Sequence, residues 1–364
     1  MRSGISAQVW LVAFAIAATA SRPATADDRQ DCLKGSKETV AATIVACTHA
    51  IESGDYNGRE LSSLYHQRGF AWSWTSSADR VDRAFKDYSE AIRLDPKAVG
   101  SLLNRSHIDN QRHDYDRAIA DVNQAFDGGP SDYGKRVGYG ERGYAYQAKG
   151  DNDRAIADYT DVIRLDADNK AALTARGNAY LAKGDPDRAT ADYDRVIALD
   201  PKYAIAYYNR SLAHRAKGDL DRVIADCSEA IALYPNYRDA YFNRGYANQA
   251  KGDFDRAIAD YDHMIALDPN DRDALGSRAA AYLSRGDFRR AIADYSQGQA
   301  LIWLATIVLS AVAIWLCYRT GRHAGVWWPR RTVAEMCERD VVDMQRKNAV
   351  LERIAVALEK HSLG

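Results

Sequence analysis

The sequence has almost no excess of either charge. It carries 49 Lys and Arg against 50 Asp and Glu, a formal net charge of -1 over 364 residues. This balance argues against a nucleic-acid partner held by bulk charge. Hydrophobic residues make up 46% and charged residues 27%, which excludes wholesale disorder. We therefore expect a folded protein that does not bind nucleic acid.

The sequence also lacks the motifs of common catalytic and metal sites. Its eight His show no metal-ligand spacing, and G-x-S-x-G, H-E-x-x-H and G-x-x-x-x-G-K-[ST] are missing. One G-x-G-x-x-G match, Gly138–Gly143, lies inside a helical pattern with no strand before it, so it does not predict a dinucleotide site. We expect no metal, no cofactor and no enzymatic activity.

Long apolar runs are confined to the two ends of the chain. The first follows Met1-Arg2, extends from Val9 to Ala18, and precedes the small-residue site Ala24-Thr25-Ala26. A basic start, a short apolar run and such a site predict a secretory signal peptide over residues 1–26. The alternative is an uncleaved anchor, although the run is short for a span of ~20 residues.

The second apolar run covers residues 300–318 and contains 19 residues without charge. As a helix it would be ~28 Å long, enough to cross the hydrocarbon core of a bilayer. Trp303, Trp315 and Tyr318 lie near its ends, where amphipathic rings favour the headgroup level. We predict a transmembrane helix, with a buried core helix as the alternative.

Charges beside the second run set its orientation. Arg319, Arg322, Arg330 and Arg331 follow it without an intervening acid, whereas Arg289 and Arg290 before it are offset by acids. The basic side stays in the cytoplasm. Residues 27–299 would then be exported, and the tail 319–364 would remain inside. The signal peptide requires the same direction.

Between the two runs, one unit is repeated along the chain. Gly-Asp recurs every 34 residues, and each copy is followed by a variant of D-R-A-I-A-D-Y. Each unit has two segments with apolar residues at helical spacing, and no strand-like alternation interrupts them. The repeated Gly would end the first helix, and a Pro ends the second in most units. The Gly positions are Gly150, Gly184, Gly218, Gly252 and Gly286.

This pattern resembles the tetratricopeptide repeat (TPR) family. The family has a 34-residue period, an aromatic-x-x-x-Gly-x-x-Tyr first helix, a central Ala and a terminal Pro. Matches include Tyr139, Gly143, Tyr146 and Ala155 in one unit, and Gly177, Tyr180, Ala189 and Pro201 in the next. The resemblance implies an all-α superhelix of about seven helix pairs over residues 61–299, preceded by a partial helical unit over 27–60.

Two charged columns run through all seven units. Because an Arg in each first helix recurs together with an Asp in each second helix, we predict an ion pair between the two helices. A track for a charged ligand is the alternative. A column of small Ala should allow close helix packing. The pairs are Arg68–Asp87, Arg105–Asp121, Arg142–Asp158, Arg176–Asp192, Arg210–Asp226, Arg244–Asp260 and Arg278–Asp294.

The resemblance further implies a concave face lined by the first helices. Residues there vary between units, as recognition requires, and mix aromatic and amide side chains suited to an extended peptide. The alternative is that some of them only pack between helices. We find no repeated Asn and Lys set of the kind that clamps a peptide's terminal carboxylate. The candidates are His66, Phe70, Trp74, Tyr144, Gln147, Asn178, Tyr208, Arg215, Phe242, Tyr246 and Gln249.

The sequence predicts a structural role for three of the five cysteines. Cys32 and Cys47 lie 15 residues apart in the exported partial unit. Export permits a disulfide, and closing such a loop would stabilise by ~3 kcal/mol on the chain-entropy model. Cys227 occupies a position held by Tyr in other units, so we expect a core thiol there.

The tail has a helical pattern over residues 332–360. Apolar residues at 3,4 spacing with one Asn on the seam resemble a parallel two-stranded coiled coil, which would make a homodimer. A single amphipathic helix on the membrane surface fits the same residues.

Three functions follow from these features. The first is a non-catalytic adaptor that binds extended segments of partner proteins while anchored by one membrane span. The second is a transmembrane relay that couples external binding to dimerisation of 332–360. The third is an accessory subunit of a cell-envelope enzyme. Resemblance to secreted bacterial repeat proteins implies the inner membrane, with the repeats in the periplasm and the C-terminus in the cytoplasm.

Overall fold

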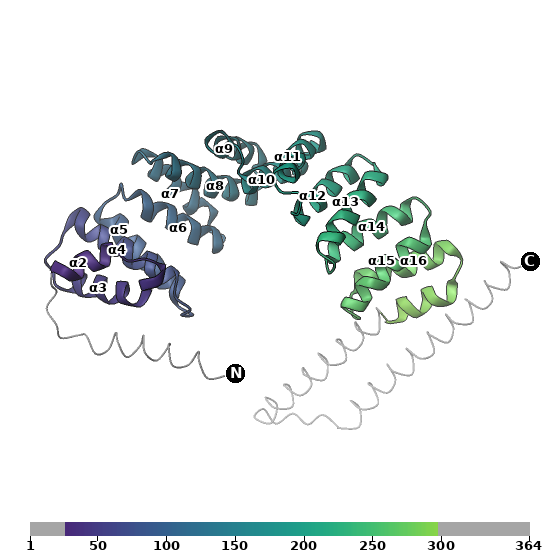
Figure 1. Ribbon diagram of the computed structural model, residues 1–364, viewed down its shortest axis with the longest axis horizontal. Helices are drawn as coiled ribbons and strands as arrows, with labels where there is room; N and C mark the ends of the chain where they lie inside the picture. Colours follow the sequence, from purple (N-terminus) through teal and green to yellow (C-terminus); the bar gives the residue numbers. More distant parts are fainter. Residues whose placement is uncertain (1–25, 298–364) are drawn as a thin grey trace, which may run out of the picture. The chain divides into compact units, whose positions relative to one another are not determined.

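The computed structural model describes residues 26–297, and their regular structure is helical (Figure 1). No helix within that range is long and apolar enough to cross a membrane. The predicted signal peptide up to residue 25, the 300–318 span and the 319–364 tail lie outside the described residues. The helices are α2 (Ala26–Leu33), η1 (Lys37–Thr39), α3 (Val40–Glu52), α4 (Gly58–Ser73), α5 (Arg80–Leu94), α6 (Val99–Gln111), α7 (Tyr115–Asp127), α8 (Asp132–Ala148), α9 (Asn152–Leu165), α10 (Lys170–Ala182), α11 (Pro186–Leu199), α12 (Ala204–Ala216), α13 (Leu220–Leu233), α14 (Arg238–Ala250), α15 (Phe254–Leu267) and α16 (Arg272–Arg285).

The chain forms two compact units, and the boundary between them falls inside α11. Unit 1 ends at Asp192 and unit 2 begins at Tyr193. In each unit, a helix packs against the next one in the chain, and the two helices of a repeat form a pair. Some first helices also contact the first helix of the following pair, as α6 does with α8 and α14 with α16. This is the arrangement that the repeat predicts.

Each repeat is joined internally by the predicted ion pair. In α8, Nε and Nη2 of Arg142 donate to Oδ2 and Oδ1 of Asp158 in α9, at 2.9 and 2.7 Å. All seven predicted pairs are present with the aspartate buried, so this prediction is confirmed. Two parallel bonds to one carboxylate fix orientation as well as distance. The pair therefore sets how the two helices face each other.

A close contact between a glycine of the first helix and a tyrosine of the second lies beside the ion pair. The residue after Arg142 is Gly143, and a Cβ on it would lie 2.9 Å from Cε1 of Tyr159. Gly69 and Gly245 face Tyr88 and Tyr261 in the same way. Where the first helix has Ser106 or Ser211 instead, the second helix carries the smaller Val122 or Cys227 in that register. Cys227 is fully buried, which confirms the expected core thiol, and burial raises its pKa to about 11.

Turns between the paired helices explain the repeated Gly-Asp. Gly150 has φ 81°, a left-handed conformation that glycine adopts without strain. The next residue, Asp151, caps α9 by accepting a hydrogen bond from the backbone N–H of Arg154 at 3.2 Å. Gly184, Gly218, Gly252 and Gly286 take the same conformation. The dipeptide therefore ends one helix and starts the next.

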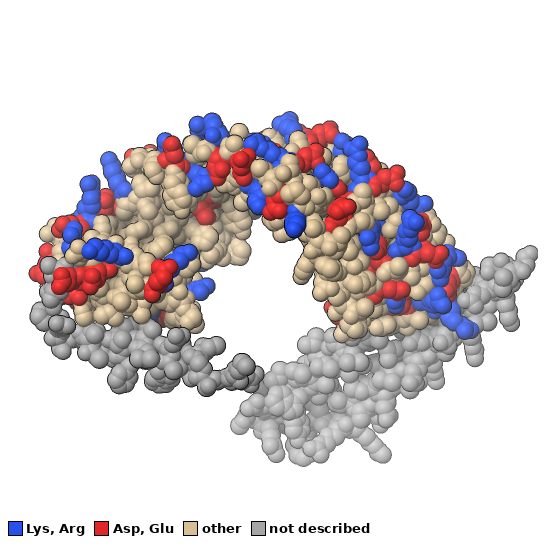
Figure 2. All heavy atoms as spheres, in the orientation of Figure 1, with Lys and Arg blue, Asp and Glu red and all other residues tan. Residues whose placement is uncertain are grey.

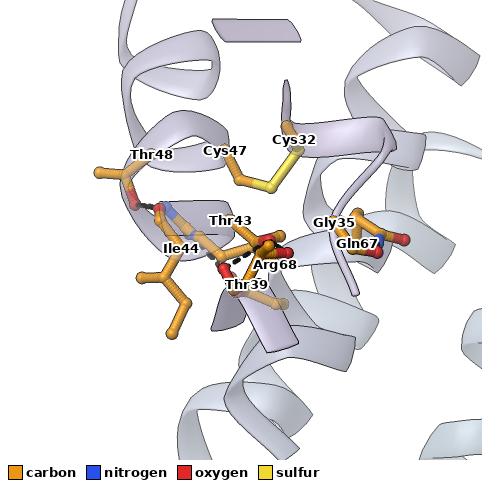
Figure 3. Close-up of a disulfide and its surroundings, with 10 residues drawn as sticks. Cys32, Gly35, Thr39, Thr43, Ile44, Cys47, Thr48, Gln67 and Arg68 are labelled. Atoms are coloured by element: carbon orange, nitrogen blue, oxygen red, sulfur yellow. Dashed lines mark hydrogen bonds and ion pairs between the residues drawn. A yellow bond between two sulfur atoms is a disulfide. The ribbon is translucent and has the colours of Figure 1, made fainter. Parts of the chain in front are cut away.

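The N-terminal segment is tied to the first repeat (Figure 3). A disulfide joins Cys32 in α2 to Cys47 in α3. Nη1 of Arg68 donates to Oγ1 of Thr48 at 3.3 Å, and Nε2 of Gln67 donates to the backbone oxygen of Gly35 at 3.0 Å. The predicted partial unit therefore packs on α4.

A substitution pair in α8 tests the fit between glycine and tyrosine. Gly143→Ala should destabilise the protein by ~1–3 kcal/mol, because the new methyl group overlaps the Tyr159 ring. Gly140→Ala, in the same helix, meets no atom within 4 Å and should be neutral or stabilise by up to ~1 kcal/mol. Urea unfolding followed by circular dichroism measures both. Equal effects from the two changes would contradict the fit.

Aspartates of α9 test the value of the internal ion pair. Asp158 is buried against Arg142, whereas Asp153 is exposed and pairs with Lys183 of the next repeat. Asp158→Ala should cost ~3–5 kcal/mol, since it leaves a half-buried guanidinium without its carboxylate. Asp153→Ala should cost less than ~1 kcal/mol. Thermal unfolding of both variants at moderate salt checks the difference, and a small loss for Asp158→Ala would argue against this role.

Candidate functional site

The candidate residues occupy one face of the first helices. Counted from the repeated Arg, they lie two residues before it, two after it and five after it, with Trp74 one position further. Spacings of four and three residues place side chains on the same side of a helix. The repeated Arg points instead toward the second helix of its own pair. The repeated arginine and the exposed candidates Tyr144 and Tyr246 therefore lie on different sides of the helix. Gln147 and Gln249 still reach a buried tyrosine of the partner helix.

Exposure divides the candidates into two groups. Trp74, Tyr144 and Tyr246 are 46%, 50% and 49% exposed, and Asn178 and Arg215 are exposed as well. The other six are half-buried. Figure 2 shows largely uncharged surface over α6 and α8 of unit 1, whereas charged side chains gather over the second helices α7 and α9. The half-buried group comprises His66, Phe70, Gln147, Tyr208, Phe242 and Gln249.

At the start of unit 1, the candidates contact neighbouring segments. Nζ of Lys37 lies 3.5 Å from the centre of the Trp74 ring, and Phe70 lies edge-on to that ring with centroids 6.1 Å apart. Nδ1 of His66 lies 2.9 Å from Oγ of Ser101, so this side chain joins α4 to α6. Burial lowers the pKa of His66, which favours the neutral ring. His66 therefore serves the packing between repeats.

Two candidate glutamines share one arrangement. The Tyr159 hydroxyl donates to Oε1 of Gln147 at 3.0 Å, and the Tyr261 hydroxyl donates to Oε1 of Gln249 at 3.2 Å. Burial raises the pKa of Tyr261 to about 12, so its hydroxyl keeps its proton. With each Oε1 engaged, each glutamine has its NH₂ group left for a ligand. An exposed tyrosine, Tyr144 or Tyr246, lies three residues before each glutamine.

In unit 2 the candidates form a connected aromatic and basic surface. The Tyr208 ring packs on Tyr237 with centroids 5.0 Å apart. Nη1 of Arg215 donates to Oδ1 of Asn243 at 2.5 Å, and its Cζ lies 5.9 Å from the centre of the Tyr246 ring. Phe242 packs against the buried Tyr261. Three of the five candidates in unit 2, namely Tyr208, Arg215 and Phe242, thus contact an aromatic ring.

Several contributing residues were not singled out by the sequence. Asn243 and Tyr237 hold Arg215 and Tyr208, and the Tyr115 ring lies edge-on to Tyr144 with centroids 6.4 Å apart. For Asn243 and Tyr237 the sequence offers a weak signal, because each recurs in the preceding repeat. Asn243 shares its register with Asn209 in the preceding repeat, and Tyr237 follows a Pro by two residues, as Tyr203 does.

A buried acid beside this face of unit 1 was also missed. Asp109 occupies a register that holds Tyr146 in the next repeat, and it is 1% exposed with Oδ2 unpaired among the described residues. Burial, together with the charge of Asp121, raises its pKa to about 6. Nearby, Nδ1 of His107 lies 2.9 Å from Oε1 of Glu141, which raises the pKa of His107. The junction of α6 and α8 therefore holds titratable groups.

Asp109 makes a prediction about pH. Its pKa of about 6 in the folded protein lies above the ordinary value of 3.8, so ionised Asp109 destabilises the fold. This destabilisation is absent at low pH and complete above pH ~6. Asp109→Asn should therefore stabilise the protein at pH 7.5 by about 2–3 kcal/mol, at ~1.4 kcal/mol per pKa unit. The gain should vanish near pH 4. Denaturant unfolding across this range checks it, with the exposed Asp116→Asn as control, and a gain independent of pH would contradict it.

Comparison with known proteins agrees with the helix pairs. Tetratricopeptide repeat profiles match residues 141–189, 174–238 and 239–271. No curated protein matches the chain. The crystal structure of MamA is 30% identical and covers 43% of this chain and 92% of its own, with a TM-score of 0.42.

Two further solved structures are similar in fold. The C-terminal part of a TPR repeat-containing protein from Cytophaga hutchinsonii is 20% identical and covers 68% of this chain and 97% of its own, with a TM-score of 0.54. A tetratricopeptide repeat protein from Parabacteroides merdae is 17% identical and covers 66% and 92%, with a TM-score of 0.52. At such identities the likeness shows the fold alone. The chain therefore contains tetratricopeptide repeats, which the profiles match at residues 141–271.

Proposed function

We propose that the chain is a non-catalytic adaptor that binds extended segments of partner proteins on the first-helix face of its repeats. The observation that carries this proposal is the repeated pairing of an exposed tyrosine with an oriented amide. Tyr144 with Gln147 and Tyr246 with Gln249 occur 102 residues apart in the same register. The tyrosine ring offers contact area to a side chain of the bound peptide, and the glutamine N–H can donate a hydrogen bond to a peptide backbone carbonyl.

The contrast between recurring and varying residues supports a binding role. The recurring Arg and Asp are engaged with each other inside the fold, which favours structure over a ligand track. The varying residues carry the exposed aromatic, amide and guanidinium groups. A face that differs from repeat to repeat can select one sequence of side chains along an extended polypeptide.

The proposal extends to location. The apolar run 300–318, with arginines after it, would hold the repeats on the outer side of a bacterial inner membrane, and residues 1–26 would direct export. A disulfide between Cys32 and Cys47 suits an oxidising compartment such as the periplasm.

Tyrosines on and off the face test the binding role. Tyr144→Ala and Tyr246→Ala should each weaken the binding of a copurifying partner protein by at least ~1 kcal/mol, about fivefold in Kd. Each substitution removes a central aromatic contact. Tyr133→Ala is the control, since its side chain is 69% exposed near the start of α8 and does not belong to the candidate set. Partners are captured by crosslinking in cells, and affinities follow from titration. Unchanged binding in both face variants would contradict the proposal.

Reporter fusions test the location. Alkaline phosphatase should be active when fused after Gly286 and inactive when fused after Gly364, whereas a fluorescent protein that fails to mature outside the cytoplasm should show the reverse. Activity of the phosphatase at both sites, or at neither, would exclude a single span with the repeats outside.

A further inference from the structure

Arg215 differs from the repeated arginines of the first helices in unit 2. Arg210, Arg244 and Arg278 each bind a carboxylate of the adjacent second helix. Arg215 is exposed at the end of α12, and its recorded side-chain hydrogen bond goes to the Asn243 amide. Within the described part of the chain, no Asp or Glu oxygen forms an ion pair with it. Its charge is therefore open to a ligand.

A buried asparagine, Asn243, orients the Arg215 guanidinium. Nη1 donates to Oδ1 of Asn243 at 2.5 Å, and Asn243 is 2% exposed. Nδ2 of Asn243 in turn donates to Oγ of Ser211 at 3.5 Å. A buried amide that accepts one N–H leaves four others on the fork. Arg215 is thus positioned in advance, which lowers the entropy lost when a ligand binds.

An aromatic ring lies beside the Arg215 guanidinium. Cζ of Arg215 lies 5.9 Å from the centre of the Tyr246 ring. Arg215 also acts on Tyr208 by its charge, although burial raises the pKa of that hydroxyl overall. The Tyr246 ring therefore offers apolar area directly beside the charge.

The oriented polar groups of this surface are donors. Gln249, on the neighbouring first helix α14, has its oxygen engaged by the Tyr261 hydroxyl and its NH₂ left over. Arg215 offers only N–H groups. A complementary ligand must therefore bring acceptors, and a carboxylate matches the fork of a guanidinium with two parallel bonds.

We propose that unit 2 selects an acidic side chain, Asp or Glu, within an extended polypeptide. Its carboxylate binds Arg215 beside the Tyr246 ring, and a backbone carbonyl further along accepts a hydrogen bond from Gln249. This rests on the proposed peptide-binding function. An internal side chain is favoured over a chain end, because the positions after Arg215 and Gln249 are Ala216 and Ala250. No second cation therefore adjoins Arg215 at the register that could fix a terminal carboxylate.

Selection from random peptides tests this inference. The full chain in detergent is applied to an array of short random peptides with amidated ends. Bound peptides should be enriched in Asp and Glu, with acidic peptides binding roughly tenfold more tightly than their Asn and Gln counterparts. Arg215→Glu should reverse the preference toward Lys and Arg, and Arg215→Lys should keep it at lower affinity. Arg222→Glu, an exposed arginine of α13 paired with Asp219, is the matched control and should change nothing.

The outcomes separate this inference from the proposed function. If the parent chain and Arg215→Glu select the same peptides, while circular dichroism shows both folded, selection by Arg215 is wrong and peptide binding stands. If acidic peptides bind only with a free C-terminal carboxylate, recognition of a chain end replaces it. If the parent chain binds no peptide and the tyrosine variants retain their cellular partner, both proposals are wrong.

Discussion

The bidentate contact between an arginine of the first helix and an aspartate of the second is the constraint on which each repeat depends. It fixes the rotation of the first helix about its axis, because the arginine must face its partner. The tyrosine two positions after it is then exposed in α8 and α14, and the glutamine five positions after it reaches a buried tyrosine of the second helix. Such buried pairs specify an arrangement more than they add free energy. The glycine beside Arg142 sets the distance, since the Tyr159 ring leaves no room for a Cβ.

Recurrence in the sequence was sufficient to predict these internal contacts. Arg176 and Asp192 recur at the same separation as Arg142 and Asp158, and a contact within one helix pair has the same geometry in every copy. The core thiol at Cys227 followed from the same logic. Each prediction depended only on the register inside a repeat.

Contacts between consecutive repeats could not be predicted in this way. His66 reaches Ser101, and Arg215 reaches Asn243, across neighbouring first helices. Those contacts depend on the rotation from one repeat to the next, and the residues involved differ in each copy. Asp109 was visible as an acid where Tyr146 stands in the next repeat, but only the structure shows that its Oδ2 is buried without a partner among the described residues. The varying face of the first helices is therefore the part of the structure that the sequence predicts least well.

The two units present different chemistry on this face. Unit 1 exposes Trp74 and Tyr144, with His107 and Glu141 paired beside them. Unit 2 exposes Tyr246 and a guanidinium that Asn243 holds. The recurring residues hold the helices, and the varying ones differ in charge and aromatic content between units. Saturation mutagenesis of α14, scored for protease resistance and for partner binding, tests this division most directly. The account predicts that substitutions at Arg244 and Gly245 lower protease resistance, whereas those at the exposed Tyr246 lower binding alone. Unchanged binding in the Tyr246 variants, or a loss of protease resistance at Tyr246 as large as that at Arg244, would contradict it.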